Sequence, residues 1–190
     1  MKVALKNVRL AFPALFQPQS VNGSDPRFSG VFIMEPDSPN VKALETAMKD
    51  VAVAKWGDKG EKILAKLKKD KRVCLQDGDD KTNKEGDVYD GFEGMMCVSA
   101  NRDSRPLLLD RDKTELSQAD GKPYAGCYVN ASIELWAQDN KYGQRVNASL
   151  RGVQFFKDGD AFAGGTPVSE DEFDDLSDGA DADDLDDDLA

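Results

Sequence analysis

Alternation of hydrophobic and polar positions is the main pattern at the start of the chain. Residues 2–12 alternate, with one change of parity near Lys6, and residues 28–34 carry apolar side chains on both parities. The first pattern predicts a bulged strand that ends at Pro13. The second predicts a strand that is buried on both faces, with a loop between the two strands.

A β-hairpin is the clearest element that the pattern predicts. Residues 125–138 and 144–156 alternate between apolar and polar side chains, and the polar segment 139–143 connects them. Gly152 marks a second change of parity. Further short strands are expected at 73–75, 89–100 and 106–109.

A helical period follows the second strand. Ser38 and Pro39 form a typical helix start, and apolar residues then recur at helical spacing as far as Gly57. A second helix with a lysine-rich polar face is expected over 58–69. Bulged short strands with one helical insertion predict a mainly β (α+β) domain, with an OB-like Greek-key barrel as the expected fold. The pattern alone does not separate this barrel from another small barrel or sandwich.

Charge divides the chain into two parts. The whole sequence has 25 basic and 36 acidic residues, a net charge of −11. Residues 169–190 hold 12 of the acids and no base, whereas residues 1–168 have a net charge of +1. A block of like charges with little apolar surface cannot offset its ordering entropy. The expected organisation is a domain over 1–162, a flexible linker over 163–168 and a disordered acidic tail over 169–190.

The residue types argue against most catalytic chemistry. The sequence has no histidine, which removes the commonest general base and the commonest zinc ligand. Cys74, Cys97 and Cys127 form no CxxC pair, so buried thiols are expected. The acids of Asp77 to Asp80 resemble the start of a calcium loop but lack its later Glu, which favours a solvated turn. We therefore expect no enzyme, no bound metal and no cofactor.

The polar face of the predicted hairpin is the first candidate binding surface. Tyr128, Trp136 and Arg145 lie opposite its apolar row, and Arg151 follows on the same strand. Exposed rings beside arginines suit a single nucleic-acid strand, because any base stacks on a ring and arginine neutralises phosphate. The alternative is that these rings pack under a loop as a second core. Aromatic residues near strand ends present the same choice between stacking on a base and packing inside the protein. Ordinary core packing is favoured for Phe12 and Phe92.

Five short motifs point to a family when they are taken in order. They are residues 8–16 (Val-Arg-Leu-Ala-Phe-Pro-Ala-Leu-Phe), 27–30 (Arg-Phe-Ser-Gly), 76–79, 124–129 and 150–155. Together they resemble a phage single-stranded-DNA-binding protein family that was formerly a domain of unknown function. The resemblance implies an OB-fold barrel, sequence-tolerant binding of single strands, and an acidic C-terminus that recruits replication proteins. It also implies action in the cytoplasm of an infected bacterial host.

The candidate residues come from both lines of reasoning. Phe12, Phe16, Arg27 and Phe28 fall within the resembling motifs, as do Tyr124 and Tyr128. The full set of expected DNA-binding residues is Arg9, Phe12, Phe16, Arg27, Phe28, Lys71, Arg72, Tyr89, Arg102, Arg105, Tyr124, Tyr128, Trp136, Tyr142 and Arg145. The expected partner-binding residues of the tail are Phe173, Asp174, Asp175, Asp186, Asp187, Asp188 and Leu189.

The sequence therefore predicts a non-enzymatic single-stranded-DNA-binding protein of phage type, which protects DNA during replication or recombination. Its tail would recruit partner proteins and would also compete with DNA for basic groups. No apolar stretch approaches the roughly 20 residues of a membrane span, so no membrane partner is expected. Two alternatives stay open. One is a barrel that binds only protein, for example in virion assembly, and the other is a metal-dependent nuclease that uses aspartate clusters.

Overall fold

Strands make up most of residues 1–162, which are the residues that this computed structural model describes. The predicted linker and acidic tail lie outside the described residues. The strands are β1 (Lys2–Gln19), β2 (Arg27–Met34), β3 (Leu75–Asp77), β4 (Met96–Arg102), β5 (Leu107–Leu109), β6 (Tyr128–Asn140) and β7 (Gly143–Lys157). The helices are α1 (Pro39–Trp56) and α2 (Gly60–Lys69), with short 3-10 turns η1 (Gly57–Lys59), η2 (Gly78–Asp80) and η3 (Gln118–Asp120).

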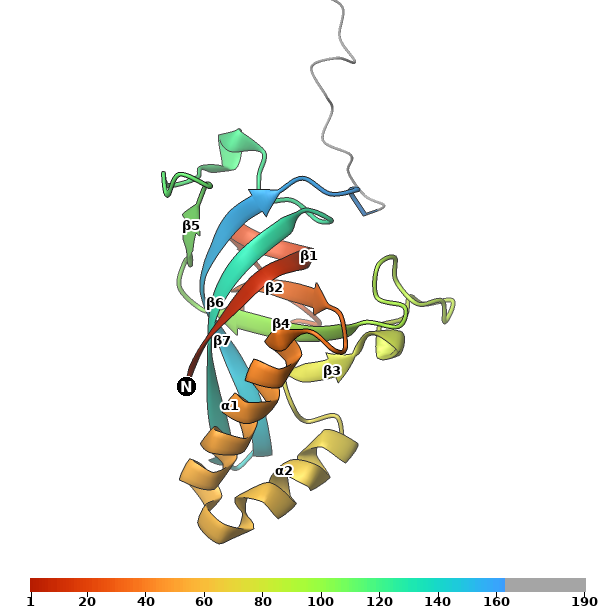
Figure 1. Cartoon of the computed structure of the whole chain (residues 1–190), viewed down its shortest axis with the longest axis vertical. Coiled ribbons are helices and arrows are strands. Elements are labelled where there is room, and N and C mark those ends of the chain that lie inside the picture. Colours follow the sequence, from red (N-terminus) through yellow and green to blue (C-terminus); the bar gives the residue numbers. More distant parts are fainter. Residues whose placement is uncertain (163–190) are drawn as a thin grey trace, which may run out of the picture.

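The sheet curves until it closes on itself. Its strand order is β3-β4-β2-β1-β6-β7-β5, and a parallel contact between Asn101 in β4 and Ser149 in β7 joins its two sides. The strands β1, β2, β4, β7 and β6 therefore form a closed five-stranded barrel (Figure 1). This is the Greek-key arrangement of an OB fold. The predicted mainly β barrel is confirmed.

Three irregularities interrupt the pairing of β1. The pairing slips after Leu5, after Ala11 and again after Ala14. The first slip confirms the bulge predicted near the start of the strand. The prediction that the strand ends at Pro13 is wrong, because β1 continues to Gln19. A bulge tolerates proline, since the residue is not required to donate a ladder hydrogen bond there.

The helices follow the predicted start and stop signals. The backbone N–H of Val41 donates to the Ser38 hydroxyl at 3.4 Å, Pro39 lies in the first turn, and Gly57 caps the C-terminus of α1. The apolar face of α1 packs on the barrel, and α2 packs against α1 (Figure 1). Within residues 1–162, no helix is both long enough and apolar enough to span a membrane.

Hydrophobic clusters lie on both faces of part of the sheet. The main cluster fills the barrel and the space beneath α1. A smaller cluster lies on the opposite face and contains Ala11, Ile33, Phe92 and Cys97. Phe32 and Ile33 are adjacent in β2 and are 0% and 1% exposed, so the C-terminal end of this strand is buried on both faces, as its sequence predicts. Towards the start of the strand, Arg27, Ser29 and Val31 leave the outer face accessible.

The smaller cluster is covered by the turns before β4, and the sequence pattern does not predict these turns. A strand was expected over 89–100, but β4 begins only at Met96 and the preceding residues form turns. Gly91 and Gly94 have φ values of 82° and 67°, a left-handed conformation that other residues rarely adopt. These turns fold Phe92 back over the outer face of the sheet. The aromatic residues of the segment before β4 therefore pack on the sheet and do not form part of a strand.

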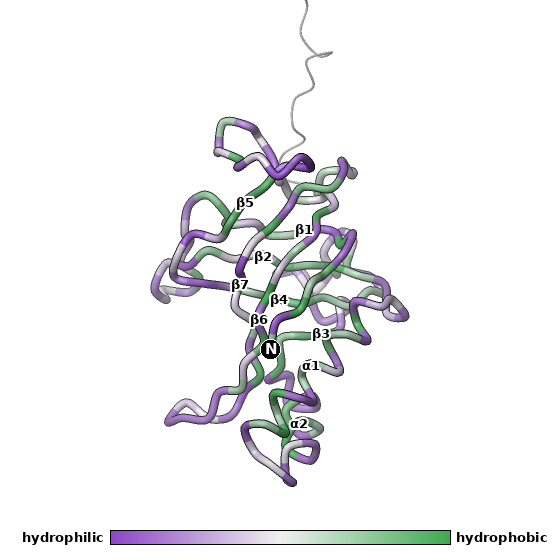
Figure 2. Tube along the Cα trace, turned by 60° about the vertical axis from the view of Figure 1, so that its left-hand side comes forward, coloured by the Kyte–Doolittle hydropathy of each residue, from purple (hydrophilic) through white to green (hydrophobic). Residues whose placement is uncertain are grey.

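The predicted hairpin is confirmed as β6 and β7. Val129, Ile133 and Leu135 face the core, while Trp136 lies on the opposite face and is 44% exposed. The pairing slips where Gly152 lies opposite β6, as the change of parity predicts. Figure 2 shows the end of this hairpin projecting from the barrel with mostly hydrophilic residues. The projection provides one wall of the cleft described below.

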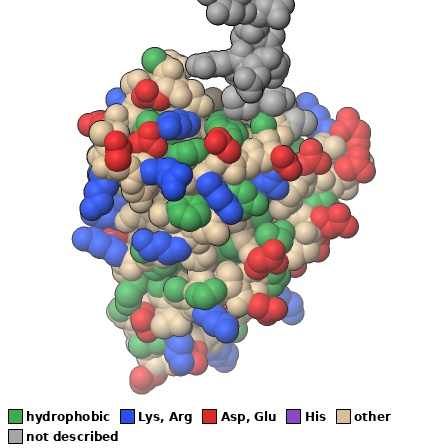
Figure 3. Space-filling model, turned by 45° about the horizontal axis from the view of Figure 1, so that its top comes forward, with side chains coloured by type: hydrophobic (Ala, Val, Ile, Leu, Met, Phe, Trp, Pro, Cys, Tyr) green, Lys and Arg blue, Asp and Glu red, His purple; other side chains and the backbone are tan. Residues whose placement is uncertain are grey.

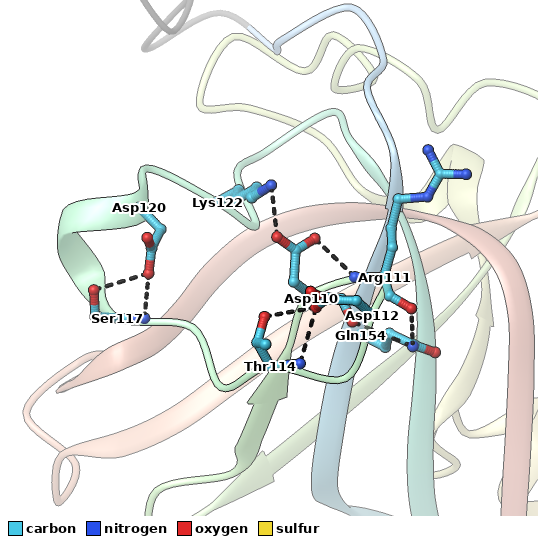
Figure 4. Close-up of polar contacts among 8 residues, drawn as sticks. All are labelled: Asp110, Arg111, Asp112, Thr114, Ser117, Asp120, Lys122 and Gln154. Atoms are coloured by element: carbon cyan, nitrogen blue, oxygen red, sulfur yellow. Dashed lines mark hydrogen bonds and ion pairs between the residues drawn. The ribbon is translucent and has the colours of Figure 1, made fainter.

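The long loop between β5 and β6 is held by carboxylates at one end of the barrel (Figure 4). Lys122 pairs with Asp110 at 2.9 Å, and this contact lowers the pKa of that carboxyl group. Hydrogen bonds from Thr114 lower the pKa of Asp112, and those from Ser117 lower the pKa of Asp120. The acids therefore stabilise the loop in their charged form.

Candidate nucleic-acid interface

A polar cleft of about 620 Å³ lies between the start of β2, the end of β4 and the outer face of the β6–β7 hairpin. Three of the predicted residues meet there, namely Arg27, Arg102 and Trp136. They come from widely separated parts of the chain, and the closing contact between β4 and β7 brings them together. The complete lining is Arg27, Asn101, Arg102, Asp103, Glu134, Trp136, Gln138, Asn147, Ala148, Ser149 and Arg151.

Trp136 offers an exposed indole ring on the hairpin wall of this cleft. Its Nε1 donates to the hydroxyl of Ser149 on the neighbouring strand at 3.1 Å. The adjacent side chains are also tied, since the Asn147 amide donates to Gln138 at 3.0 Å. These hydrogen bonds restrain the ring across the strand pair while leaving it accessible. A restrained, accessible ring loses little conformational entropy when a base stacks on it.

The charges of the cleft are mixed but favour anions slightly. Its lining holds three arginines against Asp103 and Glu134. Arg27 donates to the Asn101 side chain at 3.2 Å, which holds its guanidinium against the end of β4. Arg151 pairs with Glu134 at 2.8 Å, and this hydrogen bond lowers the pKa of Glu134. Glu134 is therefore charged at neutral pH and offsets one of the three arginines.

An aromatic pocket of about 170 Å³ is the second feature of the site. It lies over β1 and the turns before β4, and Phe12 and Tyr89 line it with their rings 5.0 Å apart in an edge-to-face contact. These rings are 51% and 40% exposed, although core packing was favoured for Phe12. Phe12 has a φ of 47°, which is unusual for a bulky residue and is a form of strain that often marks functional positions.

The outer face of β2 and β4 connects the cleft to the aromatic pocket. Arg27 lines the cleft, and Val31 lies four residues later on the same face, paired with Ala11 at the pocket. At about 3.3 Å per residue the two features are about 13 Å apart along the strand. Ser29 lies between them on this face, and Ser99 is paired with Val31 at the pocket end. OB folds commonly bind oligonucleotides on this pair of strands.

Several predicted residues near the pocket make contacts within the protein. Arg9 donates to the backbone carbonyls of Gly126 at 3.1 Å and Asp160 at 2.6 Å. Tyr124 donates to Asp158 at 2.7 Å, and burial together with this contact raises the pKa of Tyr124 to about 12. Tyr128 has Lys157 over its ring at 4.7 Å. Arg9, Tyr124 and Tyr128 therefore hold the segment that follows β7.

A third group of predicted residues lies at the far end of the hairpin. Arg72 donates to the carbonyls of Tyr142 at 2.9 Å and Gln144 at 3.0 Å, which ties the end of α2 to the hairpin. Lys71 pairs with Asp80 at 2.6 Å. The ring of Tyr142 is 71% exposed. Arg145 is exposed and lies opposite Gln138, so it extends the hairpin wall of the cleft.

The structure separates the remaining candidates from both features. Arg105 lies 5.8 Å from the ring of Phe16 and donates to Leu116, near β5. Phe28 is 9% exposed, because it shares a face of β2 with the buried Gly30 and Phe32. The prediction that Phe28 is an exposed ring on which a base stacks is therefore wrong, because its side chain is part of the core.

The acids and cysteines considered above as metal ligands have roles within the fold instead. Asp77 accepts from the backbone of Asp79, which in turn accepts from Gly94, so these carboxylates hold a turn. Within residues 1–162, no three histidine, cysteine or acidic side chains gather as a metal site. All three cysteines are buried, as expected. Burial raises the pKa of each thiol to about 11.

The fold and the cleft together define a class: an OB-type barrel with an arginine- and aromatic-lined surface on its outer face. The chain belongs to the family described as Enterobacter phage Enc34, ssDNA-binding protein, which it matches over residues 1–188. It is also 46% identical over 181 residues to protein p50 of Acyrthosiphon pisum secondary endosymbiont phage 1. That match covers 93% of this chain and 95% of p50.

Solved structures agree with this assignment. The single-stranded DNA-binding protein from bacteriophage Enc34 in complex with ssDNA has a TM-score of 0.60 and 26% identity, covering 85% of this chain and 89% of that one. The single-stranded DNA-binding protein gp2.5 of bacteriophage T7 has a TM-score of 0.55 and 10% identity. That match covers 96% of each chain and shows the shared fold.

Proposed function

We propose that this chain is a phage single-stranded-DNA-binding protein whose DNA runs through the polar cleft and along the outer face of β2 and β4. The observation that carries the proposal is the meeting of Arg27, Arg102 and Trp136 in one cleft. Membership of the Enc34 family and the fold shared with an ssDNA complex support it. The arginines would contact phosphates while the indole stacks on a base, which requires unpaired bases but no particular sequence.

The biological role that follows is protection of single strands during replication or recombination, in the cytoplasm of an infected bacterium. The acidic residues 169–190 would recruit replication or recombination proteins and compete with DNA for the arginines. Deleting these residues should tighten DNA binding at low salt, with an advantage that shrinks as salt rises. Pull-down of host or phage replication proteins should fail with the same deletion. Affinity that is unchanged at every salt concentration would remove the competitor role.

Fluorescence anisotropy with a labelled oligonucleotide and its duplex tests the proposal directly. The single strand should bind much more tightly, because stacking on Trp136 needs bases that are free of a partner strand. Equal affinity for both forms, or affinity for neither, would overturn the proposal in favour of a barrel that binds only protein. Intact DNA after incubation with magnesium or manganese would dismiss the nuclease alternative.

Tryptophan fluorescence locates the DNA within the molecule. The chain has two tryptophans, and Trp56 lies away from the cleft, where its Nε1 donates to Asp139 at 2.7 Å. Oligonucleotide should quench the wild-type emission and that of Trp56→Phe. The quenching should disappear in Trp136→Phe. Quenching that instead depends on Trp56 would place the DNA on the helical side of the hairpin.

A further inference from the structure

Four aromatic rings line the pocket over β1, and one of them comes from the end of the described chain. The lining consists of Ala11, Phe12, Tyr89, Asp90, Phe92, Ala125 and Phe162. Phe12 contacts both Tyr89 and Phe92, with ring centroids 5.0 and 5.9 Å apart. Phe162 adds a ring that is far from these residues in sequence. The pocket is therefore a small apolar space with aromatic surface from three separate segments.

Phe162 is held in place by several independent contacts. The guanidinium of Arg9 lies over its ring, 4.2 Å from the centroid, and its backbone N–H donates to Ala125 at 3.1 Å. Arg9 also bonds the carbonyl of Asp160. The close approach is allowed by Gly91, since a Cβ at that position would come within 2.6 Å of the Phe162 ring. Gly91 therefore leaves room for the Phe162 ring, and Arg9 holds the ring in place.

We propose that this pocket takes one nucleobase, turned out of the strand that follows the β2–β4 face. The inference rests on the proposed function and adds to it a specific base-binding site with Phe162 as a wall. The pocket lies about 13 Å from the cleft along β2, within reach of the same strand. The strained backbone of Phe12 presents its ring on the outer side of the sheet, where a base would arrive.

The chemistry of the lining favours a base over the other parts of DNA. Phosphate is disfavoured, because Asp90 lines the pocket, whereas Arg9 is not among the lining residues and directs its Nε and Nη2 to the carbonyls of Gly126 and Asp160. A flat heterocycle gains from stacking and edge contacts with the surrounding rings. The guanidinium of Arg9 over the Phe162 ring adds a cation–π contact that rigidifies this wall.

Abasic-site scanning tests the pocket. A short oligonucleotide of the minimal binding length is prepared with a single abasic site at each position in turn, and each affinity is measured by anisotropy. In the wild-type protein, affinity should fall when the abasic site replaces the base stacked on Trp136. It should also fall at a second position, which is the base held in the pocket. Loss of one stacked base should weaken binding by roughly 5- to 160-fold. The fall in affinity at the second position should be smaller in Phe162→Ala. It should persist in Phe162→Tyr, because tyrosine keeps the aromatic ring.

Phe156→Ala is the matched control, because Phe156 is a partly exposed ring on β7 outside both features. It should leave the abasic profile unchanged. A wild-type profile without the second position, or one that Phe162→Ala leaves intact, would overturn the pocket while leaving the proposed function standing. Tighter binding by Phe162→Ala would also overturn it, since Phe162 would then occupy the place of the base. Absence of single-strand binding by the wild-type protein would instead defeat the proposed function.

Discussion

Replacing Glu134 by glutamine should strengthen DNA binding at low salt. Glu134 accepts a hydrogen bond from Arg151 at 2.8 Å within the cleft, and both side chains are about two-fifths exposed. The contact lowers the pKa of Glu134, so the carboxylate is charged at neutral pH. Glutamine keeps the shape and an acceptor oxygen but removes the charge. Arg151 would then be available to a phosphate.

The expected size follows from the number of phosphates neutralised. The lining holds three arginines and two acids, so the substitution raises the local charge by one. One added phosphate contact on a single strand steepens the dependence of log affinity on log salt by about 0.7. A fourfold rise in salt should therefore reduce the affinity of the variant about 2.6-fold more than that of the wild type. The fold should be little affected, because an exposed ion pair contributes about 0–1 kcal/mol.

Anisotropy titrations across a salt series measure this difference. Glu61→Gln is the matched control, because Glu61 pairs with Lys49 at 2.9 Å on the helices, away from the cleft. Its salt dependence should coincide with that of the wild type. If Glu134→Gln gave a line parallel to the wild type, Arg151 would not contact phosphate, and the reasoning that Glu134 withholds Arg151 from DNA would be refuted.

Three further predictions concern the fold. Ser38→Ala removes the N-cap of α1 and should lower the free energy of unfolding by about 1 kcal/mol, as measured by urea denaturation. The carboxylates of Asp110, Asp112 and Asp120 have lowered pKa values, so the stability they contribute is present above the ordinary value of 3.8 and is lost as the pH falls below it. Hydrogen exchange of the loop 110–122 should accelerate there, and unchanged protection would contradict this reasoning. Burial raises the pKa of the cysteine thiols to about 11, so they should resist alkylation at pH 8 in the folded protein and react on unfolding.

Local patterns predict those parts of the fold whose structure is decided locally. The hairpin is predicted well because apolar residues alternate throughout β6 and β7, and α1 because Ser38 and Gly57 mark its ends. The end of β1 is missed because Pro13 lies in a bulge, where its lack of an N–H has no consequence. The turns before β4 are missed because their aromatic residues resemble a strand, and only the tertiary cluster around Phe92 shows their role.

The candidate site is predicted less completely, because its parts are joined by closure of the barrel. Arg27, Arg102 and Trp136 are identifiable as residue types, but only the contact between β4 and β7 places them in one cleft. Phe162 is missed altogether, since it stands among small and acidic residues at the end of the expected domain. Its isolation as a single aromatic residue there was the available signal. The return of the chain over Gly91 could not be predicted from it.

The near-neutral charge of the body limits how such a protein can bind DNA. Arg9, Lys71 and Arg72 are engaged by carbonyls or carboxylates, so they add to rigidity more than to phosphate binding. If Arg27 and Arg102 make the phosphate contacts while Arg151 stays paired with Glu134, log affinity should fall with log salt with a slope of only about −1.4. Stacking must then supply much of the binding energy, and it is insensitive to salt. This division explains why exposed rings and an uncharged sheet face, not a basic patch, dominate the proposed path of the strand.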